Sequence, residues 1–325
     1  MMPDLFMFLR SPEFQATLSK CRVCHFSAGT NFSTIFQSLL GSQPDSALLQ
    51  TMALKLTYTG QTTIPVEVEG LLPDLLRNAS RKEIEVFEIF HGNRKLRLAE
   101  FFRVQGSLDD GQLEFEGDLS GVHWIGAGMQ AGKIRVTGPA GRHLGSQMSG
   151  GEICVEGNAG DWVGAEMHGG FIHVKGRAGH LIGAAYRGSA VGMKAGTILI
   201  DGDVGNEIGH TMRRGLLAVG GNCGDMAGFN MIAGNVYVFG NCGIRPGAAM
   251  RRGTLGFFGS EPPPLLPTFR RATTFEPLYL QLALRKLQQL GFAVDEQLFT
   301  SSYDLYHGDF IEGGRGEITL RAQDG

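Results

Sequence analysis

Residues 145–163 read GSQMSGGEICVEGNAGDWV, and residues 164–182 read GAEMHGGFIHVKGRAGHLI. The same frame begins at glycines separated by 19, 19, 19, 26, 19 and 19 residues, namely Gly126, Gly145, Gly164, Gly183, Gly209, Gly228 and Gly247. A fixed period near twenty is typical of a solenoid, in which each repeat is one coil and neighbouring coils bury each other's apolar face. We therefore expect the stretch from Gly106 to Gly259 to form one repeat domain.

Each frame contains a short run in which apolar residues alternate, and this period of two indicates a strand. One column is apolar in every frame, as in Ile153 and Val155, and should face the inside of the coil. The other column is mixed and should face solvent or a partner: Arg135, Cys154, His173, Leu199, Ala218, Tyr237 and Gly256. Equivalent strands should pair in parallel, and parallel crossovers are right-handed almost without exception. The sequence predicts an all-β solenoid, a right-handed parallel β-helix of about seven coils with small α/β caps at both ends.

Two further columns recur. Turn residues Asn158, Asp203, Asn222 and Asn241 share one position of the frame, which predicts a ladder of side chains along the stack, interrupted at Pro139 and Arg177. A methionine column is expected to be an internal stack of adaptable core side chains. Its members are Met129, Met148, Met167, Met193, Met212, Met231 and Met250.

Composition narrows the functional class. Of the 49 glycines, 38 lie between Gly106 and Gly259, so the glycine excess belongs to the repeats. A net charge of −3 gives no overall basic footprint for nucleic acid, and no apolar run approaches the length of a membrane span. Five cysteines do not suggest a disulfide framework in a chain of 325 residues. We expect a cytoplasmic protein that binds neither nucleic acid nor membrane.

The first 51 residues do not share the pattern of the rest. Cys21 and Cys24 form a single C-x-x-C followed by His25, which is weak support for a metal or redox site because no second pair accompanies it. Met52 stands directly before a well-patterned strand, KLTYTG, so one hypothesis is that translation starts there. We expect residues 1–51 to be an extension that is disordered or wrongly assigned to the protein.

The segments flanking the repeats are expected to cover their two ends. Residues 52–105 should form an α/β cap in which LLPDLLRNAS makes a helical turn or two, while EIEVFEIF and KLRLAEFFRVQG are strands. Residues 260–325 should contain a helix from Pro277 to Leu290, with Leu280, Leu284 and Leu287 on its apolar side, and a short strand EITL near the end.

Two features of the repeats are candidate partner contacts. The coil that begins at Gly183 carries seven extra residues around YRGSAVG, including Tyr186 and Arg187, and solenoid insertions often lie on the binding face. The tetrapeptide Met-Arg-Arg-Gly occurs twice, two periods apart, so Arg213, Arg214, Arg251 and Arg252 should lie on one side of the stack. These arginines suit carboxylates, phosphates or an acidic partner. A simple bulge and a solvated charged face are the alternatives.

No catalytic constellation is evident. The sequence has no H-E-x-x-H, P-loop or G-x-S-x-G motif, and the histidines of the repeats fall in different columns. Cys223 and Cys242 lie one period apart and should stack on adjacent coils, as small buried residues or, less simply, as ligands. We therefore expect no catalytic, cofactor-binding or metal-binding residue in this chain.

The repeat resembles the glycine-rich β-helix domain that the large glutamate synthase subunit shares with the C subunit of formylmethanofuran dehydrogenase. GNRKLRLAEFFRVQG (92–106) is similar to the opening motif of that C subunit. LLPTFRRATTF (265–275) and YHGDFIEGGRGEI (306–318) resemble the bacterial version, which belongs to the formyltransferase/hydrolase complex. The resemblance covers roughly Met52 to Leu320.

The resemblance implies a non-catalytic scaffold subunit in methanopterin-linked one-carbon metabolism, where formaldehyde is oxidised to formate. It implies three partners, namely an amidohydrolase-like A subunit, the B subunit, and the formyltransferase D subunit, with a furan-type carrier at an interface between them. Hydrolase metals, and in archaeal relatives a molybdenum or tungsten pterin, would belong to the other subunits. Two alternatives remain: a glutamate-synthase-like module that supports an amidotransferase, and a carbohydrate-active β-helix enzyme.

Overall fold

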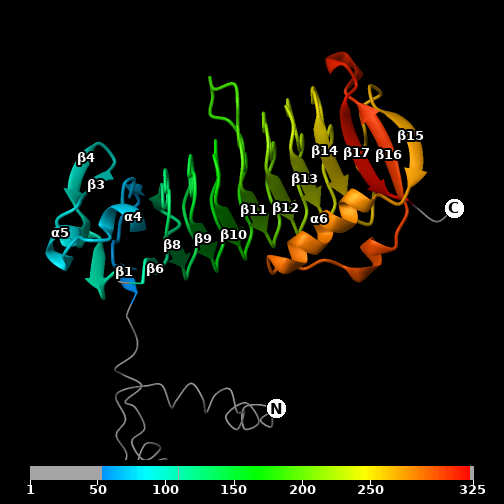
Figure 1. Cartoon of the computed structure of the whole chain (residues 1–325). Helices are drawn as coiled ribbons and strands as arrows, with labels where there is room; N and C mark the ends of the chain where they lie inside the picture. Colours follow the sequence, from blue (N-terminus) through cyan, green and yellow to red (C-terminus); the bar gives the residue numbers. More distant parts are fainter. Residues whose placement is uncertain (1–52, 109, 323–325) are drawn as a thin grey trace, which may run out of the picture. The chain divides into compact units, whose positions relative to one another are not determined.

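A computed structural model describes residues 53–108 and 110–322, which lie in one compact unit spanning Thr51–Gly325. The proposals about Cys21, Cys24, His25 and a start at Met52 fall outside the described residues. The unit is mostly β, with a sheet of 13 strands and a second sheet of four (Figure 1). The strands of the large sheet follow the order β15-β16-β17-β14-β13-β12-β11-β10-β9-β8-β6-β1-β5, and those of the small sheet follow β4-β3-β2-β7.

The strands before the repeats are β1 (Leu54–Tyr58), β2 (Val66–Glu67), β3 (Glu88–His91), β4 (Arg94–Arg97) and β5 (Phe102–Gln105). Those within the repeats are β6 (Gln112–Glu116), β7 (Val122–His123), β8 (Lys133–Val136), β9 (Glu152–Val155), β10 (Phe171–Val174), β11 (Thr197–Ile200), β12 (Leu216–Val219), β13 (Asn235–Val238) and β14 (Gly253–Phe257). Beyond them lie β15 (Arg270–Phe275), β16 (Tyr303–Gly308) and β17 (Gly316–Arg321). The helices are α4 (Pro73–Leu76), α5 (Arg81–Glu85), α6 (Leu278–Gln289) and the 3-10 turns η1 (Leu98–Glu100), η2 (Glu296–Phe299) and η3 (Phe310–Glu312).

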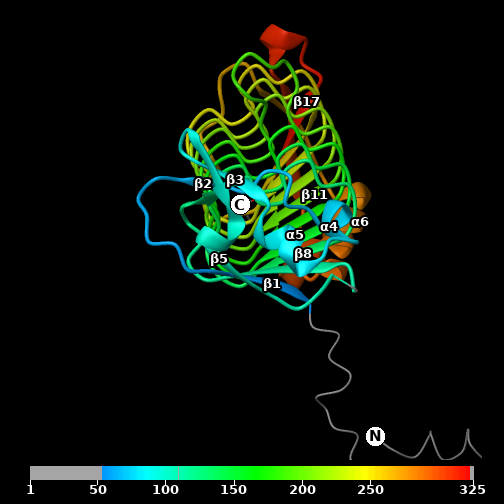
Figure 2. The same cartoon turned by 90° about the vertical axis from the view of Figure 1, so that its left-hand side faces the viewer.

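The repeat period sets the pairing of the large sheet. From β8 to β14 every strand pairs in parallel with the equivalent strand of the next frame, without a register shift. Ile172, for example, is the Cα partner of Ile153 on one side and of Ile198 on the other. Seen along the sheet, the connecting segments of successive repeats lie one behind another (Figure 2). The predicted runs are therefore strands, and they stack as the period requires.

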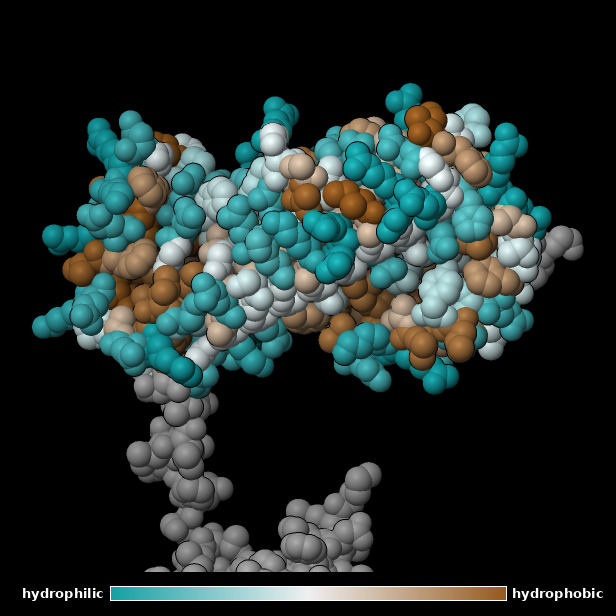
Figure 3. All heavy atoms as spheres, turned by 45° about the horizontal axis from the view of Figure 1, so that its top comes forward, coloured by the Kyte–Doolittle hydropathy of each residue, from teal (hydrophilic) through white to brown (hydrophobic). Residues whose placement is uncertain are grey.

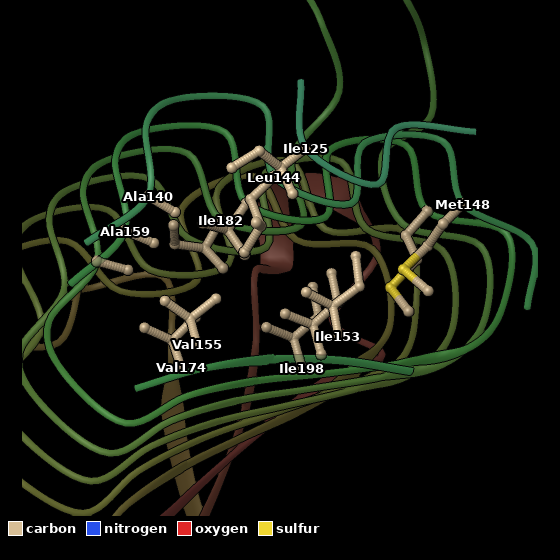
Figure 4. Close-up of a cluster of buried hydrophobic side chains, with 14 of the residues drawn as sticks. Ile125, Ala140, Leu144, Met148, Ile153, Val155, Ala159, Val174, Ile182 and Ile198 are labelled. Atoms are coloured by element: carbon tan, nitrogen blue, oxygen red, sulfur yellow. The ribbon is translucent and has the colours of Figure 1, made fainter. Parts of the chain in front are cut away.

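The core lies between the sheet and the segments that return to it. The apolar column of the strands is buried throughout, and the methionine column is fully buried, as predicted for an internal stack. Figure 4 shows Ile153 and Val155 of the sheet facing Leu144 and Ile182 of the opposite wall, with Met148 at one side of the same interior. Because each coil contributes the same set, the interior is one continuous apolar cluster along the repeats.

The outer column of the sheet differs from the prediction. Leu199, Ala218 and Tyr237 do not face solvent or another protein, because they are at most 2% exposed and pack against α6 of the same chain. The stripe Leu280, Leu284 and Leu287 of α6 supplies the other half of this cluster, which also contains Phe258 and Phe292. Nearer the N-terminus, Arg135 is exposed and Cys154 is partly exposed, so the column changes character where α6 begins to cover it.

The predicted turn ladder is present as hydrogen bonds between repeats. The Oδ1 atoms of Asn158, Asp203 and Asn222 accept the backbone N–H groups of Arg177, Asn222 and Asn241, at 2.8, 2.8 and 2.9 Å. A second ladder was not foreseen. In it Asp161, His180, Asn206 and Asp225 accept the N–H groups of His180, Asn206, Asp225 and Ile244 at 2.9–3.0 Å. Both ladders satisfy backbone donors at corners where no sheet partner exists.

The N-terminal cap is more broken than predicted. EIEVFEIF is not one strand: α5 occupies its first half, started by a capping box in which the Ser80 hydroxyl accepts from the Glu83 N–H at 3.3 Å. KLRLAEFFRVQG is likewise split by η1 into β4 and β5. The predicted helical turn in LLPDLLRNAS is α4. A local capping signal thus overrides an alternating pattern.

The C-terminal segment confirms the predicted helix and the final strand. Helix α6 follows Pro277, and β17, which contains EITL, pairs in parallel with β14 as though it were one more repeat. Strands β15 and β16 were not predicted; they add to β17 in antiparallel order.

Candidate functional site

The insertion in the coil that begins at Gly183 projects beyond its neighbours, as the tall loop that precedes β11 in Figure 1 shows. Its two ends meet at a narrow neck, where Met193 N–H donates to Gly183 O at 2.8 Å. Ala185 N–H and Gly192 N–H donate to the next coil, to His210 O at 3.3 Å and to Thr211 O at 3.0 Å. A Cβ atom on Gly192 would lie 2.7 Å from the His210 carbonyl oxygen, so only glycine closes the neck. The insertion therefore leaves the register of the repeats intact.

Beside the insertion lies an aromatic cluster formed by Trp124, His143, Trp162 and Tyr186. The first three occupy the same position in successive repeats, with φ of 65°, 63° and 66°. The rings of Trp124 and His143 stack with centroids 4.1 Å apart, and those of Trp162 and Tyr186 are 5.1 Å apart. The repeat geometry brings the first three rings into one row, and the insertion places Tyr186 across it.

The cluster is held in neutral form. Burial, aided by His123 and Arg142, lowers the pKa of His143 to about 4, and burial raises the pKa of Tyr186 to about 12. The 3.2 Å contact between the Tyr186 hydroxyl and His143 Nδ1 is thus a hydrogen bond between two uncharged groups at neutral pH. It ties the insertion to the body of the stack.

A pocket of about 340 Å³ opens between the insertion and the coils. Its walls include Trp162 and Tyr186, the pair Glu207–His210, whose side chains are 3.1 Å apart, and Arg187. The remaining lining residues are Leu181, Ala185, Gly188 and Ser189. Aromatic faces with one guanidinium and one carboxylate suit recognition of a side chain, but they do not supply a nucleophile activated by a base.

The predicted arginines are all exposed, and the repeats place Arg213 and Arg251 at the same position two frames apart, with Ile232 between them. Only Arg251 of these forms an ion pair among the described residues, at 3.5 Å to Glu312. Sequence reasoning missed Lys194 and His168, which precede Arg213 at this position and lie 3.2 Å apart between Nζ and Nε2. These residues could have been found by comparing the residue that directly follows each member of the methionine column. We call His168, Lys194, Arg213 and Arg251 the basic column.

The rest of the described chain offers no metal centre. Residues 53–108 and 110–322 contain no group of three or more histidine, cysteine or acidic side chains that could hold a metal ion. Cys223 and Cys242 pair across adjacent repeats, as predicted, with Cys223 buried; its hydrogen bond with Cys242 and its burial raise the pKa of the Cys223 thiol. None of the described helices is both long enough and apolar enough for a membrane span.

The surface carries both hydrophilic and hydrophobic side chains. Figure 3 shows hydrophilic residues over most of the face that it presents, with hydrophobic residues in separate patches. Large exposed apolar side chains include Leu75, Leu278, Leu282 and Ile311, and Leu278 and Leu282 lie one turn apart on α6. The repeats thus place two groups of aligned side chains at this surface, namely the aromatic cluster beside the insertion and the basic column.

No family model matches this chain. It is 42% identical over 83 residues to the C subunit of the molybdenum-containing formylmethanofuran dehydrogenase 1 from Methanothermobacter marburgensis, a match covering 25% of this chain and 21% of the relative. It is 38% identical over 94 residues to the C subunit of the tungsten-containing enzyme 2 from Methanothermobacter wolfeii, covering 28% and 35%. The chain therefore spans about a fifth to a third of the length of these curated relatives.

A structural comparison covers far more of the chain. A chain in the crystal structure of the formyltransferase/hydrolase complex (FhcABCD) from Methylorubrum extorquens, determined with methylofuran, is 33% identical, with a TM-score of 0.76. The match covers 83% of this chain and 100% of that one. Identity at this level over the full length of a solved subunit, together with the named relatives, goes beyond a shared fold. The chain belongs to the family of formylmethanofuran dehydrogenase C subunits, in the version found in the bacterial formyltransferase/hydrolase complex.

Proposed function

We propose that this chain is the non-catalytic scaffold subunit of a formyltransferase/hydrolase complex and holds the catalytic subunits in register. The observation that carries the proposal is the match to all of a chain of the Methylorubrum extorquens complex at 33% identity. The described residues support it, since the in-register repeats give an extended, regularly spaced surface.

We propose further that the repeats form a right-handed parallel β-helix of about seven coils. In-register parallel pairing of strands one period apart supports this, and the handedness follows from the general rule for parallel crossovers. On this basis residues 52–105 and 260–325 are the caps, residues 106–259 are the β-helix, and residues 1–51 are an extension.

The proposed partners are an amidohydrolase-like A subunit, the B subunit, and a formyltransferase, with a furan-type one-carbon carrier bound at an interface between subunits. The proposed pathway is methanopterin-linked oxidation of formaldehyde to formate in the cytoplasm. Metals, and any molybdenum or tungsten pterin, would be held by the other subunits. The insertion and the arginine pairs Arg213–Arg214 and Arg251–Arg252 are the proposed partner contacts.

Purification of the tagged chain from its native host tests the proposal. We expect an amidohydrolase-like protein and a formyltransferase to co-purify in fixed stoichiometry, identified by mass spectrometry, and formyl transfer activity to accompany them. Recovery with a glutaminase would favour the amidotransferase alternative. Recovery of this chain as a monomer without partners would contradict the scaffold role.

A further inference from the structure

The tip of the insertion is a tight turn with Arg187 at its head. Ser189 N–H donates to Tyr186 O at 2.9 Å, which closes a turn over residues 186–189. Gly188 has φ of 89°, the left-handed value that the third position of a type II turn requires. Arg187 therefore occupies the second position of the turn, and its side chain is exposed.

The turn is fixed to the body of the protein on the side of Tyr186. The Tyr186 ring lies on the aromatic cluster, and its hydroxyl is bonded to His143. Its backbone N–H donates to Glu166 Oε1 at 3.2 Å, and the second oxygen of Glu166 accepts from Gln147 at 3.1 Å. With the neck closed at Gly192, the backbone that carries Arg187 is held from both ends. Binding through Arg187 would lose little backbone freedom.

The guanidinium itself has no partner within the described residues, where neither an ion pair nor a side-chain hydrogen bond of Arg187 is present. The neighbouring carboxylates are already used: Glu207 pairs with His210, and Glu166 binds Gln147 and the Tyr186 backbone. Some exposed arginines pair, as Arg142 does with Asp161 at 3.6 Å and Arg271 with Asp304 at 2.8 Å. Others, such as Arg213, do not pair with any described residue, so what distinguishes Arg187 is the fixed backbone that carries it. Arg187 is thus a positioned cation whose charge is not used inside the unit.

We propose that Arg187 is a preorganised anchor that binds an aspartate or glutamate carboxylate on a partner subunit. The inference rests on the proposed function, because it names the chemistry of one contact in that complex. A guanidinium presents parallel N–H groups that match a carboxylate, and the pair strengthens when an interface excludes water beside aromatic side chains. Tyr186 is the positioning residue, since it fixes the turn without touching the partner's carboxylate.

The test uses the full chain and the subunits that co-purify with it. Binding of the tagged chain to those subunits is titrated for the wild type, Arg187→Gln and Arg187→Lys, and for Arg177→Gln as the matched control. Arg177 is likewise exposed and without an ion pair among the described residues, and it lies at the turn that follows β10. We expect Arg187→Gln to raise the dissociation constant about 30-fold or more, Arg187→Lys to raise it less, and Arg177→Gln to leave it unchanged.

A second readout separates charge recognition from general loosening of the loop. Arg187→Gln should also flatten the dependence of binding on salt, whereas Tyr186→Ala should weaken binding while the salt dependence stays close to that of the wild type. Normal binding by Arg187→Gln, or an equal loss in Arg177→Gln, overturns the inference while leaving the scaffold role standing. A wild-type chain that captures no subunits overturns both proposals.

Discussion

His143 shows how the position of a residue in the repeat can shift the pKa of its side chain. Its imidazole lies between two tryptophans, and its pKa of about 4 in the folded state is below the value of 6.5 that it has when exposed. Between these pH values the unfolded chain binds a proton at His143 that the folded chain does not. The contribution of His143 to folding stability is therefore fully present above pH 6.5 and is lost as the pH falls toward 4. Because the imidazole is only half-buried and solvent screens it, the loss from this one group is smaller than the roughly 3 kcal/mol that the full shift would give.

Urea unfolding at about pH 7 and about pH 4.5 measures this loss, and His143→Gln should show a smaller difference between the two pH values than the wild type. Some dependence should remain, because burial and Arg142 also lower the pKa of His123. An unchanged pH dependence in His143→Gln would contradict the assignment to this side chain.

Side chains that belong to one column were predictable, and those that depend on several columns were not. The methionine stack and the Asn158–Asn241 ladder follow from spacing alone, since a residue at the same position of every frame must meet its equivalent. The contact between Tyr186 and His143 joins an insertion to a residue 43 positions earlier, and no period contains that information.

The existence of helix α6 was likewise predictable from the sequence, whereas the residues against which it packs were not. Its apolar stripe predicts that the helix covers the end of the repeats or docks on a neighbour, but it packs on the outer column of the sheet, against Leu199, Ala218 and Tyr237. The change from Arg135 to Leu199 along the outer column marks the edge of that contact only once the helix is in place.

Substitutions on the two sides of α6 test the packing. Leu284 is fully buried, so Leu284→Ala should lower the free energy of unfolding by about 2–5 kcal/mol through lost burial and a cavity. Leu282 is 61% exposed, and Leu282→Ala on the same helix should change it by no more than about 0.5 kcal/mol. Chemical denaturation followed by circular dichroism compares them; similar losses in both variants would contradict the placement of the helix.

In the whole unit, the C-terminal segment covers a strand edge and an apolar surface that the repeats alone would leave exposed. Strand β17 covers the edge of β14, and α6 covers Tyr237 of the outer column and Phe258, whose ring contacts Tyr237. A chain that ends at Gly259 should therefore expose an unpaired parallel edge beside an apolar surface and self-associate. Size-exclusion chromatography with light scattering measures this, and a soluble monomer of the shortened chain would contradict the capping role.

The period also explains which parts of the unit could be foreseen. Repetition is visible in sequence because the same contacts recur, so strands β8 to β14 were predictable with their neighbours. The capping segments occur once, and their elements depend on local signals such as the Ser80 cap or on pairing partners far away, as for β15 and β16. Their presence was predictable, whereas their internal order was not.

The neck at Gly192 has a consequence for how such a chain can change during evolution. Every repeat is joined to the next by register-specific hydrogen bonds, so the gain or loss of one residue within a coil would misalign every later contact. Two kinds of length change escape this penalty: a whole repeat, or a loop whose ends meet as they do at the neck, where Met193 N–H donates to Gly183 O. Changes in the length of such a chain are therefore confined to whole added coils and to loops whose ends meet. The insertion at 186–192 is a loop of this type.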